Sequence, residues 1–206
     1  MLTNPTSVSN APPAPGFADA VMQSQQTFRA ALQAVAQPGS IHETELECGV
    51  PPGLSAGMTA TLLTLADVDT PVWLPPEVDE AVRQYLRFHC GCPLVSEPEH
   101  ARFVVVPAGH AAPALEHCDA GDPAYPDSSS TMLLEVDALD NEPSTASVML
   151  SGPGIADRQC LSVTGLPADF WQQWRANHQL FPLGVDAFLI QGNRLCGLPR
   201  TVVVED

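Results

Sequence analysis

The sequence predicts a three-layer α/β fold in which a mixed β-sheet is flanked by helices. Two observations support this prediction. Segments with a helical period alternate along the chain with short apolar runs, and residues 102–107 form an uninterrupted apolar run typical of a central strand. The 206 residues suffice for one sizeable core. We therefore expect a single domain over residues 17–206.

The first sixteen residues differ in composition from the rest and are expected to form a disordered arm. They consist mainly of Thr, Ser, Asn, Ala and Pro, with little that could be buried. They lack the basic start and apolar stretch of a signal peptide. No later segment offers the roughly 18 apolar residues that a membrane helix needs. We therefore expect a cytoplasmic protein that does not contact a membrane.

The first half of the domain should begin with a helix over residues 17–37. Val21, Phe28, Leu32 and Val35 recur with a helical period, so we expect this stripe to face the core, and Pro38-Gly39 should end the helix. The patterns that follow predict a strand over 41–46, a buried helix over 55–65, a strand over 70–74, a helix opened by Pro75-Pro76-Glu77 and running to His89, and a strand over 102–107.

The second half should begin with a long loop over residues 109–131, because Pro, Gly, Asp and Ser are abundant there. This loop is expected to hold one helical turn at most. The remaining patterns predict strands over 132–136, 147–151 and 161–164, a helix from Leu166 to near Leu180, and strands over 185–190 and 201–204 joined through Gly192-Asn193 and a short segment over 195–199.

The charged residues exclude several classes of function. Eight basic residues stand against 24 acidic ones, and the net charge of −16 argues against binding to nucleic acid or to an anionic membrane. All eight basic residues are arginines. Without lysine the chain cannot form a Schiff base with pyridoxal phosphate, complete a Walker-type phosphate loop or use a lysine general base.

The six cysteines are expected to be thiols. Cys90-Gly91-Cys92 is the nearest to a cluster, but its one-residue gap is shorter than the gaps of common zinc motifs. We favour small buried thiols over a metal site, and we expect no metal or cofactor. Several Cys–His pairs could be drawn for nucleophilic catalysis, but nothing in the sequence selects one of them.

The candidate ligand site consists of Ser151, Gly152, Gly154 and Arg200. The two glycines follow an expected strand and could turn backbone amides toward a phosphate or phosphonate, while Arg200 could clamp such an anion. The alternatives are a plain turn for the glycines and an internal ion pair for Arg200, with Asp186 as its natural partner.

Phe170, Trp171 and Trp174 form an aromatic patch on the expected helix after Leu166. Such a patch is most often part of the core, and the alternative is a protein interface, where large aromatic residues concentrate. These three residues are the interface candidates of the sequence.

Seven phrases of the sequence, taken in order, resemble the H-subunit family of the bacterial carbon–phosphorus (C–P) lyase core complex. They are Thr27-Phe28-Arg29-Ala30-Ala31-Leu32 through Gln37-Pro38-Gly39, Thr70-Pro71-Val72-Trp73-Leu74, Leu86-Arg87-Phe88-His89 through Pro93-Leu94-Val95, Leu150-Ser151-Gly152-Pro153-Gly154-Ile155, Val163-Thr164-Gly165-Leu166-Pro167 with Phe170-Trp171, Phe181-Pro182-Leu183-Gly184-Val185-Asp186, and Leu198-Pro199-Arg200-Thr201.

The resemblance implies a fold similar to the large domain of pyridoxal-phosphate-dependent transferases, without the cofactor site. It also implies a homodimer when the subunit is isolated, and a complex with the G, I and J subunits in the cell. The resemblance supplies no catalytic residue that can be placed in this sequence.

The leading hypothesis is therefore a non-autonomous subunit that is needed, with the G and I subunits, to form alpha-D-ribose 1-methylphosphonate 5-triphosphate from ATP and methylphosphonate. A nucleotide- or phosphonate-binding module of the same pathway is the first alternative. An independent thiol- or metal-dependent enzyme is the second.

Overall fold

The computed structural model describes residues 12–44 and 49–205, which form a seven-stranded mixed sheet and a smaller four-stranded antiparallel sheet. The expected α/β class with a mixed sheet and helices is confirmed. The second sheet was not expected. It covers part of one face of the larger sheet, where the sequence predicted helices.

The larger sheet has a parallel centre with an antiparallel edge. Its parallel strands pair in the order β9, β5, β4, β2 and β3, and β10 and then β1 add antiparallel to β9. In sheet order the strands are β1 (Ile41–Glu43), β10 (Arg194–Leu198), β9 (Asp186–Gln191), β5 (Thr131–Glu135), β4 (Phe103–Val106), β2 (Val72–Trp73) and β3 (Leu94–Val95).

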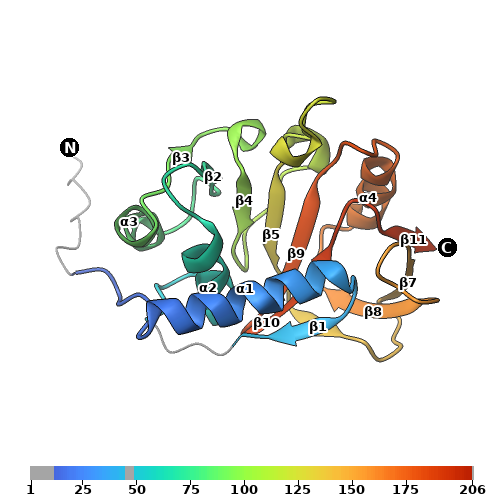
Figure 1. Ribbon diagram of the computed structural model, residues 1–206, viewed down its shortest axis with the longest axis horizontal. Coiled ribbons are helices and arrows are strands. Elements are labelled where there is room, and N and C mark those ends of the chain that lie inside the picture. Colours follow the sequence, from blue (N-terminus) through green and yellow to red (C-terminus); the bar gives the residue numbers. More distant parts are fainter. Residues whose placement is uncertain (1–11, 45–48, 206) are drawn as a thin grey trace, which may run out of the picture.

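Both faces of this sheet are buried, as the apolar run in β4 predicted. Val105 faces a core shared with helices α1 (Ala20–Ala36), α2 (Ala56–Leu65) and α3 (Glu80–His89). Its neighbours Val104 and Val106 point to a second core under α4 (Phe170–His178) and the smaller sheet. This alternation follows from the two-residue period of a strand. Figure 1 shows α1 and α4 on different parts of the sheet.

The smaller sheet closes the second core and contains the chain's last strand. Its order is β11 (Val203–Glu205), β7 (Ser147–Ser151), β8 (Gln159–Thr164) and β6 (Ala138–Asp140). Leu139, Leu150 and Leu161 of this sheet are buried in the same cluster as Trp174 of α4. The strand expected at 201–204 therefore exists as β11, and it pairs antiparallel with β7 in the smaller sheet.

The helix starts follow their capping residues. The hydroxyl of Ser55 accepts a hydrogen bond from the Met58 amide, so the buried helix α2 begins where the sequence predicted. The start expected for α3 at Pro75 was wrong: residues 75–78 form a turn, and the helix begins at Glu80 after Asp79, whose carboxylate accepts from the Ala81 amide. In the described part of the chain, no helix is long and apolar enough to span a bilayer.

The side of α1 that faces the core differs from the expected one, because of the four expected residues only Val35 packs against the core, and it is partly buried. The helix is confirmed, but Val21, Phe28 and Leu32 are more than half exposed. The buried positions are small or polar, namely Gln23, Thr27, Ala30, Ala31 and Ala34. The close approach of α1 to β10 explains this difference, because a Cβ on Gly197 would lie 2.6 Å from the carbonyl carbon of Ala34.

Three strands were missed by the sequence analysis. The segment over 195–199 was expected to be a connection, but it belongs to β10, which forms a hairpin with β9 through Gly192-Asn193. The other two missed strands, β3 and β6, have only two and three residues. The long loop expected over 109–131 is present up to Ser130, but it contains two short 3₁₀ turns, η2 (Leu115–His117) and η3 (Pro126–Ser128), and not one at most.

The end of the expected N-terminal arm packs on α3. The Pro15 carbonyl accepts hydrogen bonds from the Gly49 amide, at 2.9 Å, and from the Tyr85 hydroxyl, at 3.3 Å. A ring nitrogen of His89 lies 2.8 Å from the Ala14 carbonyl. Residues 14–16 therefore belong to the folded domain, and residues 1–11 of the expected arm lie outside the described part of the chain.

Candidate functional site

The glycine turn after β7 packs closely against the end of α1. Gly152 and Gly154 have φ angles of +128° and +86°, which favour glycine. A Cβ at Gly154 would lie 2.3 Å from the Ala36 carbonyl oxygen, and one at Gly152 would lie 2.9 Å from the Thr201 oxygen. Both glycines are therefore required by the turn and its packing, as the plain-turn interpretation predicted.

Arg200 lies in a dense polar cluster at the amino end of β9. Its Nε is 3.1 Å from Asp186 Oδ1, its Nη2 is 2.5 Å from Asp186 Oδ2, and its backbone amide donates to the same carboxylate at 2.7 Å. Nη1 donates to the Pro126 carbonyl at 3.0 Å, and Nη2 also donates to the Ser129 hydroxyl. The predicted ion pair with Asp186 is thus confirmed.

The four candidate ligand residues do not meet around one space. Thr201, next to Arg200, packs on Gly152, but the guanidinium of Arg200 contacts Asp186, Ser129, Pro126 and Pro182, none of which belongs to the turn. The Arg200 side chain is 11% exposed. Any anion that bound to this guanidinium would have to compete with the Asp186 carboxylate, which already binds its Nε and Nη2.

Two of the three aromatic candidates are core residues. Phe170 and Trp174 are 2% and 0% exposed, and their rings stack with centroids 5.9 Å apart. The indole nitrogen of Trp174 donates to the Val202 carbonyl at 3.2 Å, which joins α4 to the segment before β11. Trp171 is partly buried against the same core. Of the three residues, only Trp171 presents part of its surface to the outside.

A cavity of about 480 Å³ lies between η2 and α4, and the sequence analysis did not foresee it. Leu115 and Cys118 line one wall and Gln173 lines the other, with the Gln173 side chain accepting from the Leu115 amide at 2.8 Å. The charged residues that line it are Glu116 and Asp169, and no arginine does. Because both charges are negative, the cavity disfavours phosphate or phosphonate groups.

The cysteines of the described chain are poorly placed for nucleophilic attack, because Cys90, Cys92, Cys118 and Cys196 are all buried. Burial raises the pKa of Cys118 and of Cys196 to about 12. A hydrogen bond between Cys90 and Cys92 raises the pKa of Cys90 and lowers that of Cys92, and both residues are buried. Among residues 12–44 and 49–205, no three His, Cys, Asp or Glu side chains are grouped to hold a metal.

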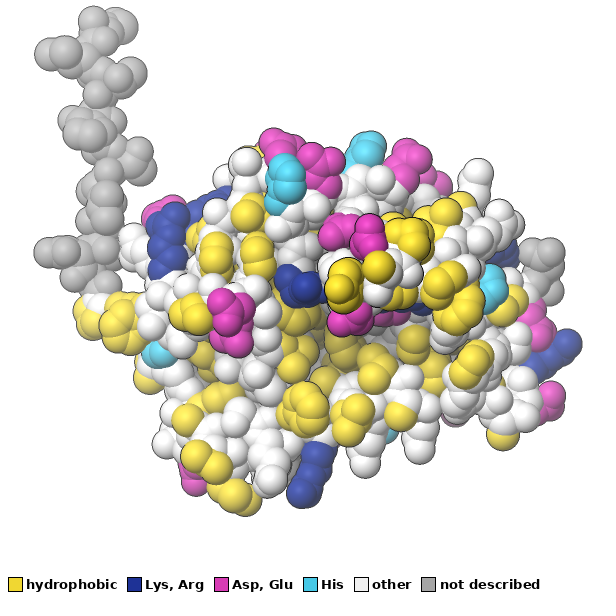
Figure 2. All heavy atoms as spheres, turned by 45° about the horizontal axis from the view of Figure 1, so that its top comes forward, with side chains coloured by type: hydrophobic (Ala, Val, Ile, Leu, Met, Phe, Trp, Pro, Cys, Tyr) yellow, Lys and Arg dark blue, Asp and Glu magenta, His cyan; other side chains and the backbone are white. Residues whose placement is uncertain are grey.

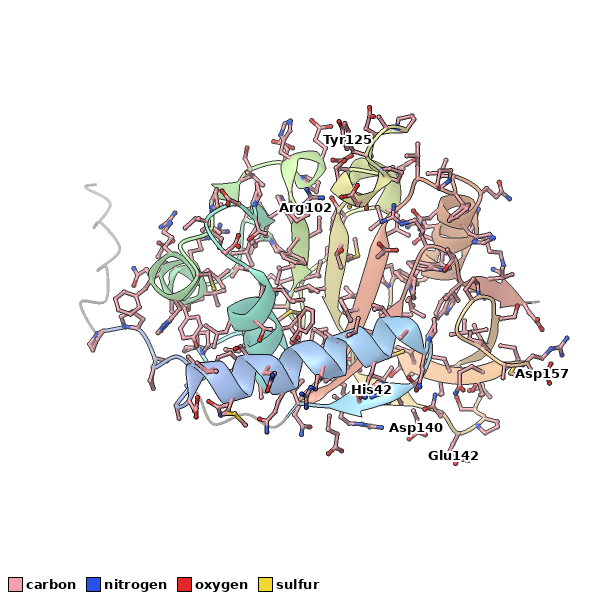
Figure 3. All side chains as sticks on the ribbon, in the orientation of Figure 1. His42, Arg102, Tyr125, Asp140, Glu142 and Asp157 are labelled. Atoms are coloured by element: carbon pink, nitrogen blue, oxygen red, sulfur yellow. The ribbon has the colours of Figure 1, made fainter. Side chains whose placement is uncertain are left out.

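A Ser–His contact at the start of β1 had no signal in the sequence. Ser40 Oγ lies 2.7 Å from Nε2 of His42, and burial lowers the pKa of His42. The same hydroxyl donates to the Gln37 carbonyl at 2.5 Å, so its proton is directed toward the end of α1 and away from the imidazole. The pair therefore caps a helix and does not activate a nucleophile. Figure 3 shows His42 in the lower part of the view, away from Arg102 and Tyr125 in the upper part.

Comparison with known proteins matches almost the whole chain. Residues 15–205 match the family described as bacterial phosphonate metabolism protein (PhnH). A Rhizobium meliloti (strain 1021) protein, named alpha-D-ribose 1-methylphosphonate 5-triphosphate synthase subunit PhnH, is 34% identical over 191 residues, which cover 92% of this chain and 94% of that protein. A putative C-P lyase subunit protein HtxG from Stutzerimonas stutzeri is 37% identical over 79 residues, or 37% of each chain.

Proposed function

We propose that this chain, which belongs to the PhnH family of bacterial phosphonate metabolism proteins, acts as a non-autonomous subunit of a C–P lyase core complex. In this role it is needed, with the G and I subunits, to form alpha-D-ribose 1-methylphosphonate 5-triphosphate from ATP and methylphosphonate. The observation that carries the proposal is the similarity to a named subunit of that synthase over 92% of the chain.

The proposal includes the cellular setting and the partners. The chain works in the cytoplasm together with the G, I and J subunits, and it forms a homodimer when it is isolated. Its net charge of −16 supports partners that are proteins and not nucleic acids or anionic membranes.

The chemistry of the chain supports a role through association. It contains no lysine, its best-placed arginine is engaged by Asp186, and burial raises the pKa of Cys118 and Cys196 to about 12. A thiol with so high a pKa is almost entirely protonated at neutral pH and is a poor nucleophile. We further propose that the fold is related to the large domain of pyridoxal-phosphate-dependent transferases. The parallel strands at the centre of the larger sheet support this relation, and the absence of lysine agrees with a form that has no cofactor site.

A ligand-binding module is the second candidate function. The observation in its favour is the left-handed backbone at both Gly152 and Gly154, which is a common feature of amide nests for anions. In this role the turn of Ser151, Gly152 and Gly154 would hold a nucleotide or phosphonate, and Arg200 would have to release Asp186. Calorimetry of the purified chain with ATP and with methylphosphonate tests the idea, and the absence of heat with both ligands would rule it out.

The main experiment is genetic complementation. A strain that lacks its own H subunit should grow on methylphosphonate as sole phosphorus source when it carries this chain, and should fail with an empty vector. The Cys90→Ser, Cys92→Ser double variant should complement as well as the parent, because the proposal assigns the thiols no chemistry. Failure of this variant alone, in folded form, would favour the thiol- or metal-dependent alternative.

A biochemical experiment complements the genetic one. The partner-free chain, incubated with ATP and methylphosphonate, should give no ribose phosphonate triphosphate, whereas addition of the G, I and J subunits should give product. Turnover by the isolated chain would contradict the proposal.

A further inference from the structure

Helix α1 carries its large apolar side chains on the outside of the molecule. Val21 is 77% exposed, and Phe28 and Leu32 are 51% and 54% exposed. These residues are spaced by seven and four positions, so they lie along one side of the helix, with Met22 beside them at 51% exposure. We call Val21, Met22, Phe28 and Leu32 the α1 stripe. In Figure 1, α1 lies in front of the sheet with no other helix or strand over its outer side.

The stripe cannot turn inward, because the space between α1 and the sheet is too narrow. The strand beneath carries Gly197, where even a Cβ would come within 2.7 Å of the Ala34 oxygen and 2.8 Å of the Val35 amide nitrogen. The inner side of the helix is accordingly built from residues such as Ala30, Ala31 and Ala34. The exposed stripe is therefore a fixed surface of the folded domain.

The charge of this surface differs from that of the whole molecule. Between Ala20 and Ala36 the helix contains no Asp or Glu and one basic residue, Arg29, in a chain with 24 acidic and eight basic residues. With the residues that the structure describes, Arg29 forms no ion pair. Figure 2 shows acidic side chains mainly on the upper half of the face in view, and mostly apolar and uncharged side chains on the lower half, where α1 runs.

These observations together define what would fit the surface. Exposed apolar patches of this kind mark contact sites, and aromatic residues and arginines such as Phe28 and Arg29 are enriched in them. Arg29, next to Phe28, requires a carboxylate from the partner once water is excluded. A second copy of the chain offers no such group from its own α1, and a two-fold arrangement of the two helices would add a second Arg29.

We infer that the α1 stripe, with Arg29, is the docking surface for a different subunit of the complex, one that presents apolar side chains and a carboxylate. The inference rests on the proposed function, because it assumes that the chain works as a subunit. It assigns the contact to the outer face of α1 and leaves the aromatic residues of α4 in the core.

The test uses the tagged full-length chain co-expressed with the G, I and J subunits. Phe28→Glu and Leu32→Glu should each lower the amount of co-purified partner per tagged chain by about tenfold or more, since a charge would enter an apolar contact. Arg29→Glu should lower it as well, and Arg29→Lys should restore much of it. Thermal unfolding should change little in all four variants, because the altered side chains are exposed.

Phe88→Glu on α3 is the matched control, since Phe88 is 71% exposed and lies outside the stripe. It should co-purify the partners as the parent does. Full recovery of partners by Phe28→Glu and Leu32→Glu would overturn the inference while the proposed function stands. Failure of the parent itself to recover any partner would overturn both. Light scattering that shows a parent homodimer becoming monomeric in Phe28→Glu would assign the stripe to a second copy and would also overturn the inference.

Discussion

Arg200 is the residue at which distant parts of the chain meet. Its guanidinium contacts Pro126 and Ser129 in the long loop, Pro182 after α4 and Asp186 in β9. Its carbonyl oxygen lies 2.9 Å from Nδ1 of His178. A planar group with several fixed donors can join so many segments, which a lysine ammonium cannot do with the same geometry. The role of Arg200 in this structure is therefore to hold these segments together.

Removing the Arg200 side chain should lower the stability of the folded protein, because the partly buried Asp186 carboxylate would lose its partner. We expect Arg200→Ala to lower the free energy of unfolding by about 2–4 kcal/mol, with Arg200→Lys in between. The control is Arg158→Ala. The Arg158 side chain is 59% exposed, compared with 11% for Arg200, so its 2.8 Å pair with Glu205 should contribute about 1 kcal/mol or less. Urea denaturation of the three variants gives the comparison. Equal losses at the two arginines would contradict the structural role of Arg200.

Glu135 shows how burial affects a carboxyl group at the end of β5. Burial raises its pKa, and hydrogen bonds from the side chain and backbone of Ser55 and from the Gly192 backbone lower it to a smaller extent. Its Oε2 is buried and has no hydrogen-bond partner among the described residues. The folded state therefore favours the protonated form more than the unfolded chain does.

This shift predicts the sign of a pH dependence. Because the folded protein binds the proton more tightly, the stabilising effect is fully present below the pKa of Glu135 in the unfolded chain and is lost as pH rises through the higher, folded pKa. The Glu135→Gln variant cannot titrate. Its unfolding free energy relative to the parent should therefore rise as pH increases above about 4.5, the ordinary pKa of a glutamate, and through the higher pKa of Glu135 in the folded protein. A constant difference over this range, measured by denaturation, would contradict the prediction.

The candidate site shows which parts of a site a sequence can reveal. The ion pair of Arg200 with Asp186 was predicted as an alternative, because the chain has only eight basic residues for 24 acidic ones and each arginine has many possible carboxylate partners. The cavity was not predicted, because its walls around Leu115 and Gln173 are far apart in sequence and neither has a motif of its own. The Ser40–His42 contact also depends on the geometry at the end of α1.

The sequence patterns predicted which helices and strands exist better than they predicted which side of a helix is buried or which strands pair. The strand β4 follows from its uninterrupted apolar run, and α2 from Ser55 and the apolar residues behind it. The strand β10 was missed because Gly197 and Pro199 are typical of connections. The same glycine also changes which side of α1 is buried, an effect that depends on a tertiary contact and has no signal within the helix itself.

The contact between α1 and β10 should be highly sensitive to volume. Gly197→Ala places a Cβ within 2.8 Å of three backbone atoms of Ala34 and Val35, so the helix must shift away from the sheet. We expect a loss of about 2–3 kcal/mol in the free energy of unfolding. Gln33→Ala, on the exposed side of the same helix, should change it by about 0.5 kcal/mol or less. Similar stability of the two variants would show that the contact tolerates extra volume.

For the whole molecule, the important feature is that the two sheets share one core. Leu134 and Leu189 of the larger sheet and Leu150 and Leu161 of the smaller one belong to the same buried cluster, together with Trp174. The other cluster, under α1, α2 and α3, rests on the opposite face of the same strands. If the packing between the two sheets is lost, apolar surface of both sheets is therefore exposed.

This shared core predicts a single cooperative unfolding transition. Circular dichroism, which follows the backbone, and fluorescence of the three tryptophans should give the same midpoint. Leu161→Ala in the smaller sheet and Leu62→Ala in α2 each empty a fully buried position and should lower stability by about 2–5 kcal/mol. Because the clusters share the strands between them, each variant should shift both signals equally. Separate midpoints in either variant would mean that the smaller sheet unfolds on its own.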